Sequence, residues 1–179
     1  IGYSVSVGFA LNSELSTRPT EVRYATNKEA KFMFDLPIKG RMPQNENEIA
    51  LDTIVLDKLG VPHEIGSNIT LKYTINGKQA TDKFILSGYW KGDSVTPSSM
   101  AWISEKFINA KIGDIDYKYV KNHIKETGNF TGLIFADVMF SNSFNVKNKL
   151  LKILKDNGYT EANIPVGVNW AYTDRKSVV

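Results

Sequence analysis

The side chains most able to do acid–base chemistry in this chain are two histidines. His63 lies in the turn Val61-Pro62-His63-Glu64 beside an acidic residue, and His123 lies in a lysine-rich stretch. Either imidazole could act as a general base if the fold brought it to a nucleophile. A partly exposed surface histidine is the more common case. We therefore expect both to be solvated surface residues, and a hydrolase that uses one of them is the least favoured function.

Three acidic residues are the strongest candidates for a metal site. Asp114 and Asp116, with Glu105 upstream, offer the oxygen ligands that hard cations prefer. A calcium loop needs several more oxygen donors at fixed spacing, and these are missing from the sequence. The chain also has no cysteine, which excludes disulfides, thiolate metal sites and cysteine nucleophiles. We expect no metal.

One short run alternates aromatic and basic residues, as single-strand nucleic-acid binders do. It is Tyr117-Lys118-Tyr119-Val120-Lys121. The net charge is only +3 and the lysines are interspersed with acids, so the sequence lacks the electrostatic pattern of a nucleic-acid-binding domain. The run is better read as a solvated amphipathic face, and no nucleic-acid partner is expected.

Sequence signatures of catalysis are absent. The chain has no GxSxG elbow, no phosphate-binding GxxxxGK[ST] loop, no HExxH and no dinucleotide fingerprint. Asn68-Ile69-Thr70 and Asn129-Phe130-Thr131 match the glycosylation sequon, which is expected by chance in an asparagine-rich chain. We therefore predict a non-catalytic domain with no catalytic, cofactor-binding or metal-binding residue, and the sequence assigns no ligand-binding residue.

The composition predicts a folded domain of ordinary kind. The chain has 179 residues, of which 42% are hydrophobic and 23% charged. No apolar run approaches the roughly 20 residues of a membrane helix, so the piece given is expected to be soluble, as a cytosolic protein or as an ectodomain without its anchors. Of its 22 basic residues only Arg18, Arg23, Arg41 and Arg175 are arginine, a bias typical of AT-rich bacterial genomes.

Local patterns in the first half predict short strands and helices. Alternating apolar residues predict a half-buried strand over residues 3–9, with a second strand at 21–25 and a short helix within 28–36. A strand at 48–51 should lead into a helix that Asp52 caps and Gly60 ends. Alternation over 69–75 followed by Asn76-Gly77 predicts a hairpin, whose second strand runs through 83–89.

Signals in the second half are less regular. A strand is expected at 101–103 with Ser104 as the N-cap of a helix, and a polar helical stretch at 117–126. Residues 133–140 are apolar enough for a buried strand. Ser143 should then cap an amphipathic helix that Gly158 ends, with these apolar residues on one face: Val146, Leu150, Ile153 and Leu154.

The stretch from Gly40 to Gly88 carries an ordered pattern. Its pieces are Gly40-Arg41-Met42-Pro43, Glu48-Ile49-Ala50-Leu51, Leu56, Leu59-Gly60, Ile65-Gly66, Ile69, Leu71 and Phe84-Ile85-Leu86-Ser87-Gly88. This order resembles the extracytoplasmic domain of FtsX-like ABC transporter permeases, the MacB-like periplasmic core domain. That family has a GR.P turn, an EI.L strand, a short helix ending in LG, a G..I.L strand and a strand closing F.I.G. The likeness extends more loosely to Ala101-Trp102-Ile103-Ser104 and to residues 133–159.

The pattern is understandable without an active site. Arg41 beside Pro43 can tie down a loop by multidentate hydrogen bonding, and the glycines supply turns and helix ends. We interpret these as scaffold residues. A functional surface should then lie elsewhere, and we place it on residues 90–132.

The resemblance implies an α+β fold with two lobes. A porter-like lobe of mixed strands and helices would comprise residues 1–36 and 131–173, an inserted and mostly β lobe residues 37–130, and a linker residues 174–179. In that family another strand and helix precede the position of Tyr3, so the first lobe is expected to be incomplete at its N-terminal side.

The resemblance also implies a place in the cell and a set of partners. Such a domain lies on the extracytoplasmic face of the cell membrane, between the first two transmembrane helices of a permease, and we expect a Gram-positive source. It would couple ATP hydrolysis by a cytoplasmic ABC ATPase to export or to an extracellular peptide, lipid or protein partner, within a permease dimer. The alternative is a standalone surface protein that binds a peptide or lipid substrate.

Overall fold

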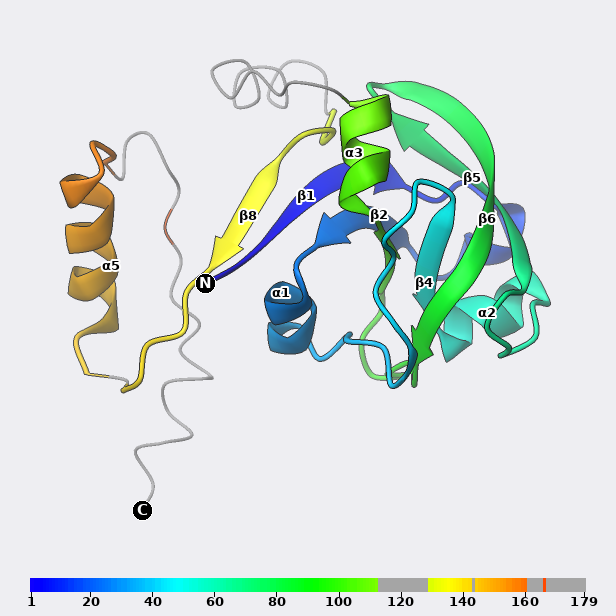
Figure 1. Cartoon of the computed structure of the whole chain (residues 1–179), viewed down its shortest axis with the longest axis horizontal. Coiled ribbons are helices and arrows are strands. Elements are labelled where there is room, and N and C mark those ends of the chain that lie inside the picture. Colours follow the sequence, from blue (N-terminus) through cyan, green and yellow to red (C-terminus); the bar gives the residue numbers. More distant parts are fainter. Residues whose placement is uncertain (113–128, 143, 161–165, 167–179) are drawn as a thin grey trace. The chain divides into compact units, whose positions relative to one another are not determined.

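The computed structural model describes residues 1–112, 129–142, 144–160 and 166 of the chain (Figure 1). The chain divides into two compact units, Ile1–Asp137 and Val138–Val179. Its mixture of strands and helices is α+β, as predicted. The elements are β1 (Gly2–Phe9), η1 (Ser13–Leu15), β2 (Thr20–Ala25), α1 (Asn27–Phe32), β3 (Lys39–Gly40), β4 (Glu48–Asp52), α2 (Thr53–Leu59), β5 (Asn68–Ile75), β6 (Lys78–Trp90), β7 (Ser99–Ile103), α3 (Glu105–Lys111) and β8 (Ile134–Asp137) in the first unit, and α5 (Val146–Asp156) in the second.

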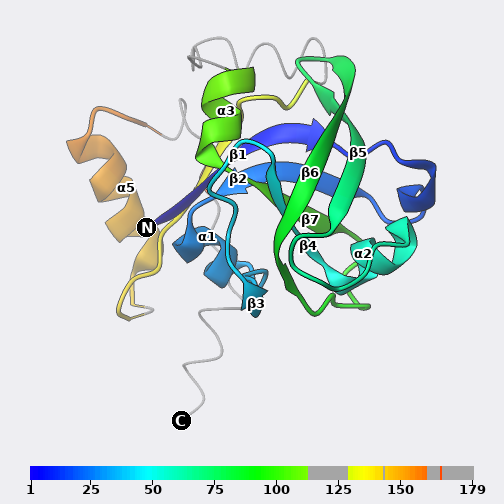
Figure 2. The same ribbon diagram turned by 45° about the vertical axis from the view of Figure 1, so that its right-hand side comes forward.

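The first unit is organised around one mixed sheet of eight strands. The strand order is β3-β6-β4-β7-β2-β1-β8, with β5 also paired to β6 (Figure 2). The pairs β2–β7 and β4–β6 are parallel, and the other pairs are antiparallel. This sheet contains strands from both of the lobes predicted above, 1–36 with 131–173 and 37–130, and the division into lobes stays a prediction.

The sheet curves until the end of β1 approaches β5. Half of β6 pairs with β5, and its other half lies between β4 and β3. Beyond the end of β1, Ala10 bridges Tyr73 of β5, and the Leu11 amide donates to the Lys72 carbonyl at 2.6 Å. The apolar side chains inside this curve form the main core, which includes Val7, Val22, Ile49, Leu51, Leu71, Tyr73, Phe84, Leu86, Ile103 and Phe107. Burial of this cluster is the chief contribution to the stability of the unit.

Helices α2 and α3 begin where the sequence predicted. Asp52 accepts a hydrogen bond from the Val55 amide at 2.9 Å, and the Ser104 hydroxyl accepts one from Phe107 at 3.1 Å. Each bond satisfies an amide that the first turn of a helix leaves unpaired. Gly60 ends α2 in the left-handed conformation at φ 65°. Both helices therefore begin at the predicted caps, and α2 also ends at the predicted glycine.

The hairpin of β5 and β6 is also confirmed. Asn76 and Gly77 have φ angles of 51° and 69°, the left-handed pair that a tight two-residue hairpin turn requires. The second strand begins at Lys78, earlier than the predicted residue 83, because pairing with β5 continues to the turn.

The strand predicted over residues 3–9 is present as β1, but the prediction that only one of its faces is buried was wrong. Ser4 and Ser6, on the face opposite Val5 and Val7, are also fully buried. The Ser6 hydroxyl donates to Glu21 at 2.8 Å, and that of Ser4 to Glu29 at 3.3 Å. Polar side chains from β2 and α1 thus cover this face, which alternation of residue types in one strand does not reveal.

The segment predicted as a buried strand, residues 133–140, contains the short β8, whose side chains are largely exposed. It ends the strand order and pairs only with β1 among the described strands. An end strand has one neighbour to pack against, which explains the exposure. The guanidinium of Arg23 lies over the Phe135 ring, 4.2 Å from its centroid, and shields part of it.

The second unit contains the predicted amphipathic helix as α5. Its apolar residues Val146, Leu150 and Leu154 are half-buried, and Gly158 follows its end at φ 81°. Asn145 precedes the helix with φ 53° and makes no side-chain cap. The predicted cap Ser143, the helical stretch 117–126 and the linker 174–179 lie outside the described residues. No helix in the described part of the chain is long and apolar enough to cross a membrane.

A second apolar cluster on the outer face of the sheet depends on Asp35. The rings of Trp90 and Trp102 lie 6.3 Å apart, between centroids. The Trp90 indole donates to the Asp35 carboxylate at 2.9 Å, and the Trp102 indole donates to the Asp35 carbonyl at 2.8 Å. Burial raises the pKa of Asp35 to about 6, although the hydrogen bond from Trp90 opposes this shift. This residue therefore joins the loop after α1 to β6 and β7.

Asp35→Asn should alter the pH dependence of stability. The folded state holds the Asp35 proton more tightly than the unfolded chain, whose aspartate pKa is about 3.9, so this group lowers the stability as pH rises from about 4 to about 6. Asparagine keeps an acceptor for Trp90 and cannot ionise. Thermal unfolding should show the variant gaining stability relative to the wild type between pH 4.5 and pH 7.5.

The two tryptophans supply a matched control. Trp90→Phe removes the donor to the carboxylate and should raise the Asp35 pKa further, whereas Trp102→Phe removes only a bond to the backbone carbonyl and should leave that pKa near its value. Carboxyl carbon NMR can follow both. A stability difference between Asp35→Asn and wild type that is the same at both pH values would contradict the account.

Candidate functional site

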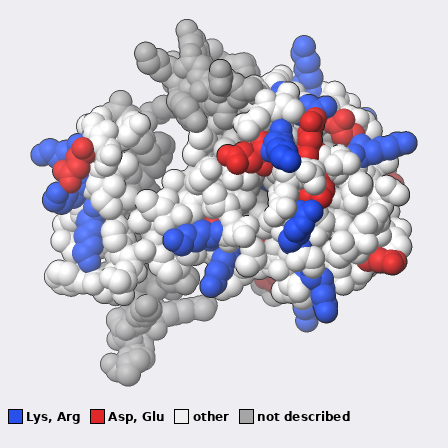
Figure 3. All heavy atoms as spheres, in the orientation of Figure 1, with Lys and Arg blue, Asp and Glu red and all other residues white. Residues whose placement is uncertain are grey.

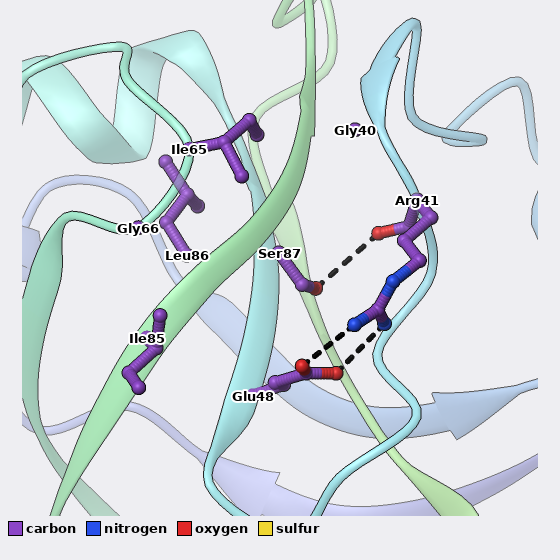
Figure 4. Close-up of a pocket in the computed structure, with 8 residues that line it drawn as sticks. All are labelled: Gly40, Arg41, Glu48, Ile65, Gly66, Ile85, Leu86 and Ser87. Atoms are coloured by element: carbon purple, nitrogen blue, oxygen red, sulfur yellow. Dashed lines mark hydrogen bonds and ion pairs between the residues drawn. The ribbon is translucent and has the colours of Figure 1, made fainter.

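The Glu48 carboxylate holds the loop that precedes β4. Both of its oxygens accept hydrogen bonds from the Arg41 guanidinium, at 2.7 and 2.8 Å (Figure 4). The amides of Gln44 and Asn45 donate to it at 2.8 and 3.1 Å, and the Asn45 side chain at 3.0 Å. Hydrogen bonding from Arg41 holds the pKa of Glu48 well below its ordinary value. Arg41 thus ties down the loop, as the sequence predicted, through an acid that the prediction did not name.

Glycines allow β3 and the following Arg41 to lie directly on β6. The Arg41 amide donates to the Ser87 carbonyl at 2.9 Å. A Cβ on Gly88 would overlap the Arg41 carbonyl oxygen, and one on Gly40 would overlap that of Ser87. Gly40 also has φ 71°, which side chains disfavour. The Ser87 hydroxyl, on β6, lies 3.2 Å from the carbonyl oxygens of Arg41 and Ile49. It therefore joins β6 to β4 and to the residue that follows β3.

A shallow hollow of about 360 Å³ lies beside this ion pair. Its apolar side contains Ile65 and Ile85, which are 47% and 39% exposed. The polar side chains around it are already bonded within the loop and strands, so none stands ready as nucleophile or base. The lining residues are Gly40, Arg41, Glu48, Ile65, Gly66, Ile85, Leu86 and Ser87 (Figure 4).

A second hollow, of about 310 Å³, lies between β6 and α3. Its central acid Asp82 accepts a hydrogen bond from the buried Tyr73 hydroxyl at 2.6 Å and lies 3.6 Å from the Lys111 amine. Burial, followed by the bond to Asp82, raises the pKa of Tyr73 above its ordinary value. The Tyr73 hydroxyl is therefore a structural donor, and the hollow is also lined by the exposed Glu46.

His63 lies on the surface after α2, as predicted. Its Nε2 is 2.8 Å from the Asp57 carboxylate, and its ring packs 5.8 Å from that of Tyr89, between centroids. No serine or threonine hydroxyl in the described ranges is hydrogen-bonded to this ring. The histidine and its acid are an exposed pair without a nucleophile.

The other residues singled out in the sequence are dispersed. Glu105 begins α3, while Asp114, Asp116, His123 and the run 117–121 lie outside the described residues. Within the described ranges no group of three or more histidine and acidic side chains could hold a metal ion.

Both sequon asparagines are described. Asn68 is exposed at the start of β5, and Asn129 is half-buried. The Thr131 hydroxyl donates to the Val7 carbonyl at 2.6 Å and accepts from the Asn76 amide at 2.7 Å. The second sequon therefore contains a residue that joins β1 to the hairpin turn.

Three buried charged residues were missed by the sequence interpretation: Arg18, Arg23 and Glu29. Arg18 donates to the Ser99 hydroxyl and to the carbonyls of Thr96 and Asp93, at 2.6 to 2.9 Å, and so fixes the loop after β6. Glu29 is 1% exposed, and one carboxylate oxygen has no partner among the described residues. Burial, then the charge of Asp137, raises the pKa of Glu29. The Arg18 contacts are 75 to 81 residues apart, so no local pattern could have indicated them.

Comparison with protein-family models and with curated proteins found no match. Among solved structures, the chain is similar to the periplasmic region of MacB from Actinobacillus actinomycetemcomitans, with 12% identity, a TM-score of 0.44, and coverage of 87% of this chain and 66% of that one. It is also similar to a domain of a protein described as a permease from Porphyromonas gingivalis, with 9% identity, a TM-score of 0.45, and coverage of 90% and 65%. The chain thus spans just under two thirds of the length of each neighbour.

Glu48→Gln should destabilise the first unit by about 2 kcal/mol. The hydrogen bonds to a charged carboxylate are lost, and the two loop amides are left with a neutral, weaker acceptor. Because the folded-state pKa of Glu48 is lowered, its stabilisation is present above the unfolded glutamate pKa of about 4.3 and is lost as pH falls below it. The gap in unfolding free energy between wild type and variant should therefore narrow from pH 7 to pH 3.

Urea unfolding at several pH values measures this gap. Glu64→Gln, which changes an exposed glutamate in the turn after α2, is the matched control and should be close to neutral. A Glu48→Gln gap of the same size at pH 3 and pH 7 would show that the ionised carboxylate is not what holds the loop.

Proposed function

We propose that this chain is a non-catalytic extracytoplasmic domain of an ABC transporter permease of the FtsX-like kind. One observation carries the proposal. The separate sequence pieces that resemble this family, from Gly40 to Gly88, occupy β3, β4, α2, β5 and β6, and the Arg41–Glu48 pair and the Ser87 contacts bind three of these strands together. The pattern therefore corresponds to one packed unit, as expected of a fold signature.

The state of the polar side chains supports a non-catalytic role. Catalytic groups need a free base or nucleophile within hydrogen-bond reach of a substrate atom. At the two described hollows, Arg41, Glu48 and Asp82 are bonded to protein partners, and Glu46 and Lys83 are exposed side chains at the rim. The bonded residues stabilise strands and loops, and chemistry is left to an associated ATPase.

In this proposal the domain transmits conformational change. A well-packed sheet can move as a rigid body, which is what coupling between separate sites requires. The partners would be a cytoplasmic ABC ATPase, reached through the complete permease, a second permease copy and an extracellular peptide, lipid or protein. The two-lobe division and a Gram-positive source belong to the same proposal. No observation favours the alternative of a standalone surface protein that binds peptide or lipid.

The absence of cysteine makes the location testable. Val95 is 88% exposed in the loop after β6, so Val95→Cys gives a single reactive thiol at little structural cost. In the complete gene product in intact cells, a membrane-impermeant maleimide should label this thiol without lysis, and the product without the substitution, labelled in parallel, reports any thiol outside these 179 residues. Labelling only after lysis would contradict the proposal.

Extraction then separates the two candidate functions. A permease should stay in the membrane pellet after alkaline carbonate washing and co-purify with an ATPase in detergent, whereas a surface-binding protein would be released or would purify alone. A buried thiol, as in Leu51→Cys, should remain unlabelled in folded protein and controls for unfolding.

A further inference from the structure

The end of α1 places an aromatic residue where glycine is usual. The Phe34 amide donates to the Lys31 carbonyl at 3.2 Å, and the Asp35 amide donates to the Ala30 carbonyl at 2.9 Å. These two bonds form the Schellman arrangement that ends many helices, and it requires a left-handed residue between them. Phe34 is that residue, with φ 62°. Bulky side chains rarely adopt this conformation.

The same chain uses glycine at the equivalent position of two other helices. Gly60 follows α2 at φ 65°, and Gly158 lies after α5 at φ 81°. Phe34 gains little from packing in return for its strained backbone, because it is 80% exposed. The Asp35 bonds to both tryptophans hold the loop that displays it. The phenyl ring is thus presented to solvent by a fixed backbone.

Several neighbouring exposed residues are basic or apolar. Lys28 and Lys31 are one helical turn apart, and Phe34 follows at the same step of three residues. Ile38 is 69% exposed, and Lys39 beside it is exposed as well. We call these five residues the basic–apolar face: Lys28, Lys31, Phe34, Ile38 and Lys39. Figure 3 shows Lys and Arg side chains projecting over α1.

The acids of this segment do not neutralise that face. Glu29 is buried beneath α1, and the Asp35 carboxylate is bonded to Trp90. Lys28, Lys31 and Lys39 form no ion pair with the described residues. Positive charge and exposed apolar groups therefore occur together without a local counter-charge.

We propose that the basic–apolar face docks on an anionic lipid surface. Lysines next to such a surface are attracted electrostatically, and an aromatic ring at a loop tip can enter the headgroup region. Neither of the two hollows described above includes any of the five residues, so the proposed contact does not involve those hollows. A fluid lipid surface needs no shaped groove. This lipid-binding surface is not part of the transporter function proposed above. The lipid proposal can therefore be tested independently of that function.

Vesicle flotation tests the proposal on the 179-residue chain. The chain should bind vesicles of three parts phosphatidylcholine to one part phosphatidylglycerol at low salt, bind less as salt rises, and not bind phosphatidylcholine alone. Lys31→Glu and Lys39→Glu should each lower the partition coefficient about fivefold or more, since each lysine contributes roughly that factor.

Phe34→Gly separates binding from folding. Glycine relieves the left-handed backbone, so the melting temperature should stay the same or rise while vesicle binding falls severalfold. Val95→Gly and Lys155→Glu change an exposed apolar residue and an exposed lysine outside the face, and should leave binding within twofold of wild type. No binding to anionic vesicles, equal loss in these controls, or binding of an acidic protein in place of vesicles would each overturn the proposal.

Discussion

The arrangement of β3, β4 and the loop between them depends on the Glu48 carboxylate. Its bidentate pair with Arg41 and its bonds from the Gln44 and Asn45 amides close the loop that precedes β4. That closure fixes the segment holding Gly40, which can approach β6 only because Gly40 and Gly88 lack side chains. Because the Arg41 guanidinium is partly exposed, the value of the pair comes from its geometry and its backbone partners more than from charge attraction.

Features governed by neighbouring residues could be predicted from the sequence. The caps at Asp52 and Ser104, the ending at Gly60 and the turn at Asn76-Gly77 each depend on a bond or a backbone angle within a few residues. The sequence also predicted that Arg41 holds the loop by several hydrogen bonds, because Arg, Pro and Gly close together in a turn already restrict the conformations of that turn.

Features governed by residues distant in the sequence could not be predicted from it. Whether Ser4 is buried depends on Glu29 of α1, and the exposure of β8 depends on its place at the end of the strand order. The role of Asp35 requires two tryptophans that are 55 and 67 residues away. The candidate site shows the same limit, because its hollow is formed by loop and strand segments that only the folded sheet brings together.

The account treats the Gly40–Gly88 block as scaffold, and amide hydrogen exchange of Arg41, Gln44 and Asn45 tests this most directly. Arg41 donates to the Ser87 carbonyl, and the other two amides donate to Glu48, although all three residues lie on the surface. If the block is scaffold, these amides should exchange only with global unfolding, at rates like those of the core strands β4 and β6. Fast exchange of Gln44 and Asn45 alongside a protected core would show a mobile loop, and would contradict the central claim.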